Sequence, residues 1–161
     1  MSTDSKPTVP QAQEPFTVGG FQPADAEGIV RLFRAVYGEH YPIRLFYDPA
    51  EIVRANCEGR YISIVARTPS GEVIGVNHLY PSAPYRGLYE SGVGLVRKKY
   101  RSLGVKTRTL GYLYEEFIPR YPEIEEVFGE AVCNHPYVQK AIRPSRYVET
   151  AIEVALMPAA C

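Results

Sequence analysis

The sequence feature best suited to chemistry is a basic turn that lies between an apolar segment and an amphipathic one. Residues 93–96 are apolar, and from about residue 103 the apolar positions recur at helical spacing. The turn carries six cationic side chains and no acidic one: Arg97, Lys98, Lys99, Arg101, Lys106 and Arg108. The N-terminus of a helix presents unpaired backbone N–H groups and the positive end of the helix dipole, and Gly104 leaves the backbone open because it has no Cβ. The turn therefore predicts a site for a phosphate-bearing ligand, and the alternative is a solvated charged loop.

Other reactive residues give weaker patterns. Cys133 and His135 lie two positions apart, but no third residue that would orient them is visible, so we expect no nucleophilic pair. His40 and His78 have no cysteine or carboxylate neighbours at metal-ligand spacing, so no metal site is expected. Gly92-Val-Gly94 does not continue into a Gly-x-Gly-x-x-Gly fingerprint, because Arg97 stands at the last position.

Length and composition indicate one cytoplasmic domain. The 161 residues carry a formal net charge of zero, which argues against general binding of nucleic acid. No apolar run approaches the roughly 20 residues of a membrane span, and the N-terminal residues lack the pattern of a signal peptide. The three cysteines are odd in number and far apart, which is typical of a reducing compartment. We expect a polar, flexible tail over residues 1–15 and a single domain over residues 16–161.

The order of expected elements indicates an α/β (α+β) fold. We expect strands at residues 16–22, 61–67, 72–79, 88–96, 126–133 and 149–156, and helices at 23–37, 48–58, 103–117 and from 136. The second and third strands should form a hairpin through Pro69-Ser-Gly71. The fourth and fifth strands flank a single helix, so they should be parallel neighbours. The result is a mixed, mostly antiparallel central sheet with helices on both faces.

This order, together with the turn Tyr100-Arg-Ser-Leu-Gly104, resembles the GNAT superfamily of acyl-CoA-dependent N-acyltransferases. In that family a Gln/Arg-x-x-Gly-x-Gly/Ala loop cradles the coenzyme A pyrophosphate. Arg101-Ser-Leu-Gly104 matches the first half of the loop, and Lys106 stands where the second small residue would be. Residues 37–41, 46–49 and 129–140 are similar to a bacterial GNAT subgroup with a His-Pro-Tyr-x-Gln-Lys segment after the fifth strand. The family's usual Gly-Phe after the last short helix is replaced by Arg146-Tyr147.

The resemblance implies a coenzyme site and a direct transfer. Strands 4 and 5 should splay, so that the pantetheine arm of acetyl-CoA or another acyl-CoA adds between them, and no metal is needed. The implied coenzyme-binding residues are Leu95, Val96, Arg101, Ser102, Leu103, Gly104, Val105, Lys106 and Thr107. The acyl group would pass straight to an amine in a ternary complex, where orientation alone can contribute about 7–11 kcal/mol.

Proton transfer during such a reaction needs a carboxylate near the amine. Glu90 and Glu130, each on an apolar strand, are the candidate general bases, and the alternative for both is a strand-end charge or an arginine partner. The position of the family's acidic tyrosine falls at Ile142, and Tyr137 is the nearest phenol, either a catalytic or substrate contact or a packing residue. Tyr37, Tyr41 and Tyr47 either wall the acceptor site or pack the core.

Two functions from different classes remain open. The first is an N-acyltransferase acting on a small-molecule or protein amine. The second is a non-catalytic GNAT-fold module that binds acyl-CoA or a protein partner, an alternative that the replacements at Lys106, Ile142 and Arg146 favour. We expect neither nucleic acid nor a membrane as partner, and the edge of the closing strand offers a possible homodimer contact.

Overall fold

The computed structural model describes residues 16–131, 136–145 and 147–152. Over these residues the strands are β1 (Thr17–Gly20), β2 (Ile62–Arg67), β3 (Val73–Pro81), β4 (Leu88–Val96) and β5 (Glu126–Phe128). The α-helices are α1 (Ala26–Tyr37), α2 (Pro49–Cys57), α3 (Val105–Gly111) and α4 (Tyr137–Ile142), and α3 continues as π-helical turns over Tyr112–Phe117. Short 3-10 segments lie at Pro23–Asp25, Arg44–Tyr47, Lys98–Tyr100, Ile118–Arg120 and Arg143–Ser145.

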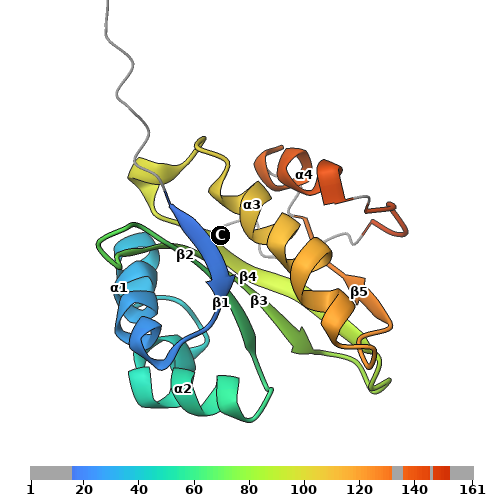
Figure 1. Cartoon of the computed structure of the whole chain (residues 1–161), viewed down its shortest axis with the longest axis horizontal. Helices are drawn as coiled ribbons and strands as arrows, with labels where there is room; N and C mark the ends of the chain where they lie inside the picture. The colour runs from blue at the N-terminus through green and yellow to red at the C-terminus, as the bar shows by residue number, and fades with distance from the viewer. Residues whose placement is uncertain (1–15, 132–135, 146, 153–161) are drawn as a thin grey trace, which may run out of the picture.

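The strands form one mixed sheet in the order β1-β2-β3-β4-β5 (Figure 1). Neighbours are antiparallel except β4 and β5, which are parallel and joined by the α3 crossover. The predicted fold class and the parallel pair are confirmed. Pairing between β4 and β5 covers only residues 88–90 and 126–128, so within the described residues the two strands separate beyond Glu90 and Phe128.

Two of the expected strands differ from the structure. The fifth strand, expected to run to residue 133, ends at Phe128, because its pairing with β4 ends there; residues 132 and 133 lie outside the described part. The closing strand was expected over residues 149–156, yet residues 149–152 are irregular and exposed, with Ile152 83% accessible. The remainder of that segment lies outside the described residues. The expected strand edge for a homodimer is therefore not formed at residues 149–152.

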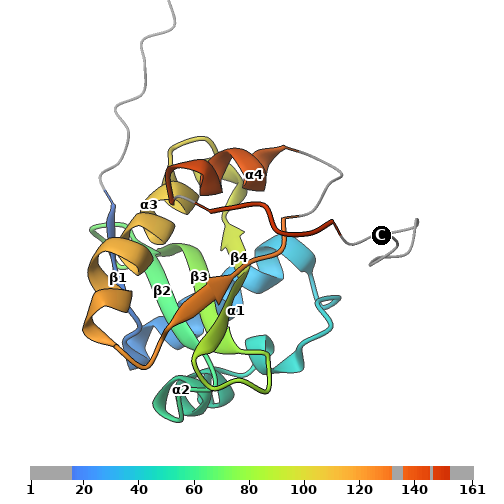
Figure 2. The same ribbon diagram turned by 90° about the vertical axis from the view of Figure 1, so that its right-hand side faces the viewer.

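Helices cover both faces of the sheet (Figures 1 and 2). On one face α1 and α2 bury a cluster that includes Ile29, Leu32, Phe33, Phe46, Ile52, Val65, Val76 and Leu95. On the other face, α3 and its π-helical continuation bury Ile64, Leu79, Leu110, Leu113 and Ile124, and Ile142 of α4 packs against this second cluster. Burial of large apolar side chains contributes about 1.5–3 kcal/mol each, so these two layers hold the sheet in place.

A buried ion pair fixes the beginning of α1 on the sheet. Arg67 at the end of β2 donates through Nε to Asp25 Oδ1 at 2.6 Å, and a second guanidinium nitrogen also contacts the Asp25 carboxylate. The same arginine donates to the carbonyl of Gly20 at 2.9 Å, while Asp25 accepts from the backbone N–H of Gln22. These contacts satisfy both buried charges, as a partly buried pair requires.

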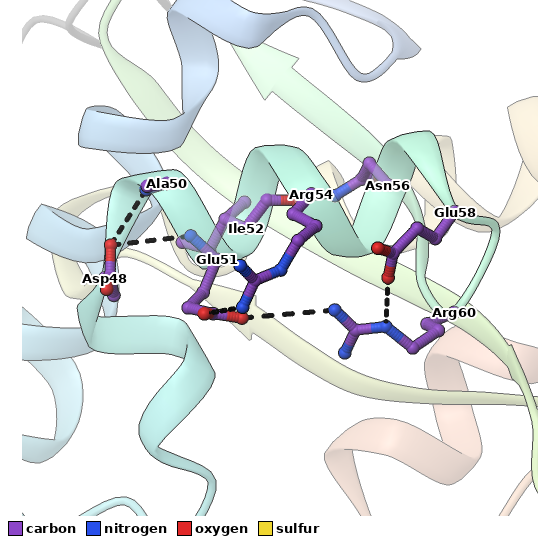
Figure 3. A network of polar contacts seen from close by, with 8 residues as sticks. All are labelled: Asp48, Ala50, Glu51, Ile52, Arg54, Asn56, Glu58 and Arg60. Carbon is purple, nitrogen blue, oxygen red and sulfur yellow. Dashed lines mark hydrogen bonds and ion pairs between the residues drawn. The ribbon is translucent and has the colours of Figure 1, made fainter.

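The second helix is fixed by local polar contacts (Figure 3). Asp48 is its N-cap and accepts from the backbone N–H of Ala50 at 2.9 Å and from that of Glu51 at 3.4 Å. Such a cap contributes about 1 kcal/mol. At the other end of the helix, Asn56 donates to the Ile52 carbonyl and accepts from the N–H of Ser63 at 2.9 Å. The amide thereby ties the end of α2 to the start of β2.

Candidate active site

A bulge in β4 marks the site. Gly92 pairs with His78 and Leu95 pairs with Val76, so two β4 residues, Val93 and Gly94, lie opposite one β3 residue. Val93 has a φ of 47°, a conformation that is strained for a β-branched residue. Bulges of this kind break the ladder and redirect backbone groups. The bulge begins at Val93, three residues after the last β4 residue paired with β5, so it lies beside the gap between the separated strands.

The gap is a cleft of about 130 Å³. Its lining comes from β4, α3, the chain after β5, α4 and the segment after α4: Ser91, Gly92, Val93, Gly94, Lys106, Leu110, Gly129, Glu130, Ala131, Val138, Ile142 and Tyr147. A second cavity of about 440 Å³ shares Gly129 and Tyr147 with it and continues along Tyr114 and β5. Backbone from a bulge, the Lys106 amine, the Glu130 carboxylate and the Tyr147 phenol thus line the smaller cleft, whose surface is mostly apolar.

The amine is that of Lys106, which points away from the basic turn. Its Nζ donates to Oδ1 of Asn77, the β3 residue opposite the bulge, and a Cβ built on Gly94 would lie 2.0 Å from that nitrogen. Burial lowers the pKa of Lys106 to about 8. Asn77 in turn donates to Ser91 Oγ at 3.0 Å, so the lysine joins a polar chain under the bulge.

The basic turn is also less positive than its sequence indicates. Glu72, from the β2–β3 hairpin, pairs with Arg97 and Lys99 and accepts from Tyr100 at 3.1 Å. Burial acts to raise the pKa of Glu72, but hydrogen bonds from Tyr100 and Lys99 and the charge of Arg97 lower it overall. Arg108 stacks over the Phe16 ring at 4.1 Å. Exposed cationic groups remain at Lys98 and at Arg101, whose Nε donates to the Val96 carbonyl.

The turn leads directly into the N-terminus of α3 and leaves space beside it. Ser102 and Gly104 have φ values of 69° and 75°, and the helix begins at Val105 immediately afterwards. Gly104 adopts this conformation without strain, and no atom lies within 4 Å of the place its Cβ would take. The first backbone N–H groups of α3 have no intrahelical partners, and the space beside them at Gly104 is open. Leu103, Val105 and Val96 pack into the core behind the turn, and Leu95 is buried on the opposite face of the sheet.

Glu90 lies on the α1–α2 face of the sheet. Tyr80 donates to its Oε1 at 2.6 Å, and a Cβ on Gly92 would lie 2.9 Å from the same oxygen. Burial, then the hydrogen bond and charge of Glu90, raise the pKa of Tyr80 well above its ordinary value. The Tyr61 ring lies 5.1 Å from that of Tyr80. Glu90 therefore sits among phenols, next to the bulge but on the other side of it from Lys106.

The three tyrosines predicted to wall an acceptor site lie together near Glu90. The rings of Tyr37 and Tyr41 are 4.9 Å apart, and the backbone N–H of Tyr41 donates to the Tyr47 hydroxyl at 2.9 Å. Burial raises the pKa of Tyr41 to about 12, with smaller contributions from Tyr37, Tyr61 and Glu90. Tyr37 is 42% exposed; burial raises its pKa, and the charge of Arg101 in the basic turn acts in the opposite direction. The aromatic cluster thus adjoins both Glu90 and the turn.

The remaining predicted residues divide between cleft and surface. Glu130 lines the cleft from the chain after β5. Tyr137 begins α4 and is 73% exposed, whereas its neighbours Val138 and Ile142 line the cleft. The phenol that does line it is Tyr147, whose hydroxyl is hydrogen-bonded to that of Tyr114. Burial and this hydrogen bond raise the pKa of Tyr114. The one signal for position 147 in the sequence is that a tyrosine stands where the family usually has phenylalanine.

His78 is a further polar group that the sequence pattern did not single out for the site. It is fully buried beneath Phe46 and Tyr61, and its Nδ1 shares a hydrogen bond of 2.9 Å with Ser63 Oγ. Burial and the charge of Lys106 lower its pKa to about 3. Its Nε2 has no hydrogen-bond partner. Across the described residues, no group of three or more His, Cys, Asp or Glu side chains is placed to hold a metal ion, and none of the helices has the length and apolarity of a membrane span.

Comparisons with solved structures identify the fold. No protein-family model matches the sequence, and no curated protein matches it. An acetyltransferase from Trypanosoma brucei superposes with a TM-score of 0.66 at 15% identity, covering 89% of this chain and 100% of the other. AAC(6')-Iy, in complex with the bisubstrate analogue CoA-S-monomethyl-acetylneamine, gives 0.67 at 15% identity, covering 89% and 98%.

A third structure, a GNAT-family acetyltransferase from Staphylococcus aureus, gives a TM-score of 0.66 at 11% identity and covers 89% of this chain and 90% of its own. All three are acetyltransferases, and each is matched over most of its length. The mixed sheet, the separated parallel pair β4–β5 and the crossover helix α3 are the elements that position the cleft in this chain. The protein has the fold of the GNAT superfamily of acetyltransferases.

Proposed function

We propose that the protein is an N-acyltransferase that transfers an acetyl or other acyl group from acyl-CoA directly to an amine. The observation that carries the proposal is the β4 bulge, which opens into the cleft between β4 and β5 beside the first turn of α3. A thioester in this cleft would meet backbone N–H groups able to polarise its carbonyl. The structural neighbour AAC(6')-Iy, which holds a coenzyme A bisubstrate analogue, supports the same assignment.

The described residues fit a coenzyme at the turn. The N–H groups of Val105, Lys106 and Thr107 start α3 and suit the pyrophosphate, with Arg101 and Ser102 at its mouth. Leu103 and Gly104 shape the turn, and Leu95 and Val96 offer backbone rather than side chains, because both side chains pack in the core. The Lys106 side chain is directed into the cleft, so we assign it no phosphate contact.

Glu90 is the carboxylate that we propose as the general base. It is half-buried at the end of β4–β5 pairing and is held by Tyr80. An acceptor amine reaching the bulge from the side of Tyr37, Tyr41 and Tyr47 would pass it. The amine nitrogen bonds to the acyl carbon, the C–S bond breaks, Glu90 receives the amine proton, and the thiolate leaves. We propose Glu130 as the alternative base and Tyr147, which lines the cleft, rather than Tyr137 as the phenol that protonates the thiolate.

A specific observation supports a second candidate. The Lys106 amine lines a cleft of only about 130 Å³, and this narrow space favours a module that binds acyl-CoA without turnover. We propose a cytoplasmic location for either function, in keeping with the free, exposed thiol of Cys57. The acceptor in the first case is a small-molecule or protein amine.

Thermal unfolding with coenzyme A tests both candidates. At 100 times its dissociation constant, a ligand of the folded state adds about 2.7 kcal/mol to the free energy of unfolding. A stabilised protein that also consumes acetyl-CoA with a panel of amines is an enzyme, and one that is stabilised without consuming thioester is a binding module. Unchanged unfolding at millimolar coenzyme A would contradict both.

A further inference from the structure

Lys106 is placed unusually for a residue of a basic turn. It is the second residue of α3, and its side chain passes inward to the bulge instead of outward to solvent. Gly94 makes room for it, since a Cβ there would lie 2.0 Å from Nζ and 3.2 Å from Cε. The Nζ donates to Asn77, whose side chain is fully buried. The amine is therefore held at one position on the cleft wall.

The surroundings of this amine favour its neutral form. Its hydrogen-bond partner Asn77 is uncharged, and burial lowers the pKa of Lys106 to about 8 from 10.5. The titratable groups around it are His78 from β3, Glu130 from the chain after β5, and Tyr147 from the segment after α4. With a pKa near 8, about a tenth of the chains carry a neutral amine at pH 7, against less than a thousandth for an ordinary lysine.

We infer that Lys106 is itself an acyl acceptor, and that acyl-CoA bound in the cleft acylates its side chain. The inference rests on the proposed function, because the cleft that would receive the thioester is the one that the Lys106 amine lines. The neutral Nζ attacks the thioester carbonyl carbon, an N–C bond forms and the C–S bond breaks. The electron pair leaves with sulfur, and the proton lost from nitrogen ends on the thiolate. One acyl-CoA is converted to one amide and one free coenzyme A.

The product would differ from the free protein at the site itself. An acyl-lysine is an uncharged amide, and it is bulkier than the amine that Gly94 accommodates. Because an amide does not exchange with thiols, the step occurs once per chain. Acylation at Lys106 would therefore fill the cleft and lower its affinity for a second acyl-CoA, so that the acyl-CoA supply regulates the protein.

The test is site-resolved mass spectrometry of the full chain after incubation with acetyl-CoA. We expect one acetyl group on Lys106, added at least tenfold faster than on Lys98 at pH 7, with a rate that rises with pH and levels off above about 8. Lys98 is the matched control, because it lies in the same turn and is exposed. Lys106→Arg and Lys106→Met should lose the rapid phase, while Lys98→Arg should keep it.

Each result separates this inference from the proposed function. Coenzyme A that stabilises the protein, together with acetylation spread evenly over exposed lysines and none on Lys106, overturns the inference and leaves the proposed function standing. If coenzyme A neither stabilises the protein nor competes with acetylation, the proposed function is overturned, and the inference that rests on it is overturned with it. If neither Lys106 variant folds, the ratio of acetylation at Lys106 to that at Lys98 in the unaltered protein decides the question alone.

Discussion

Tyr80 donates its hydroxyl proton to Glu90 at 2.6 Å, and the two residues are direct partners across β3 and β4. Glu90 is also the last β4 residue paired with β5, opposite Phe128. The carboxylate is thereby fixed where the sheet divides, with the tyrosines of the α1–α2 face around it. Burial and the Glu90 charge keep the Tyr80 phenol protonated, so this hydrogen bond persists at all physiological pH values.

Replacement of Glu90 tests its role as the general base. Glu90→Gln keeps the shape but cannot take up a proton, so we expect a loss in kcat of about 100-fold or more, with coenzyme A binding unchanged. The measurement is thioester consumption with a saturating amine. The chain contains a matched control, because Tyr85 donates to Glu125 at 2.7 Å on the exposed surface. Glu125→Gln should leave kcat unaltered, and an equal loss in both variants would refute the assignment.

The turn before α3 gives a second prediction. Gly104→Leu places a side chain in front of the first N–H groups of the helix, and we expect coenzyme A to bind at least tenfold more weakly. Gly59→Leu is the control, because Gly59 has a φ of 70°, like the 75° of Gly104, and both would have open space around a Cβ. Backbone strain of about 1–2 kcal/mol is thus common to both variants. Isothermal titration with coenzyme A compares them, and equal weakening would place the ligand elsewhere.

The elements were predictable wherever local patterns decide structure. Alternation and turn residues gave β2, β3 and β4 within two residues, and Asp48-Pro49 gave the start of α2, because caps and hairpins depend on nearby residues. The ends of the chain's last elements were not predictable. Whether residues 126–133 form a long strand depends on whether β4 remains alongside, and β4 diverges after Glu90.

The site was predictable in part, for the same reason. The turn at Gly104 follows from its own sequence, whereas the contacts of its cations depend on distant residues. Glu72 reaches Arg97 across 25 positions, and Asn77 draws Lys106 inward across 29. The face of the sheet on which Glu90 lies could not be predicted either, because the bulge at Val93 shifts the alternation of side chains along β4. Tyr147 lines the cleft because the chain after α4 packs beside it, and this packing does not follow from any spacing of residues in the sequence.

The lowered pKa of Lys106 predicts a pH-dependent stability. The folded pKa is about 8 and the ordinary value is 10.5, so between these pH values the unfolded chain binds more protons and stability rises with pH. In Lys106→Met the free energy of unfolding lacks this dependence on pH. We therefore expect the difference in free energy of unfolding, variant minus unaltered protein, to be greatest below pH 8 and to shrink toward pH 10. The lost hydrogen bond to Asn77 costs the same at every pH. Urea unfolding at pH 6, 8 and 10 gives the comparison, and a constant difference would show that the amine is not buried.

The lowered pKa of His78 predicts a loss of stability at acidic pH. Its folded pKa of about 3 lies below the ordinary 6.5, so the unfolded chain takes up a proton between these values and stability falls as the pH falls through this window. His78→Gln removes that contribution, and its acid unfolding should be shallower over the same range. Glu72 also loses stabilisation on acidification, but it does so equally in both proteins and cancels. Acid unfolding of both proteins, followed by circular dichroism, gives the comparison. Unfolding curves of equal steepness would contradict a buried neutral imidazole.

Gly94 gives the most direct test of how the Lys106 amine fits beneath the bulge. In Gly94→Ala the new methyl would lie 2.0 Å from Lys106 Nζ and 2.8 Å from Asn77 Oδ1, so the lysine must leave its position. We expect a loss of about 1–3 kcal/mol in the free energy of unfolding. Gly111→Ala is the control: no atom lies within 4 Å of its Cβ position, and in a helix the change should stabilise by about 0.5–1 kcal/mol. In a Lys106→Ala background the Gly94→Ala penalty should shrink, because the displaced group is gone. A double-mutant cycle measures that coupling, and a penalty unchanged by the background would mean that strain at the bulge, not the amine, makes glycine necessary.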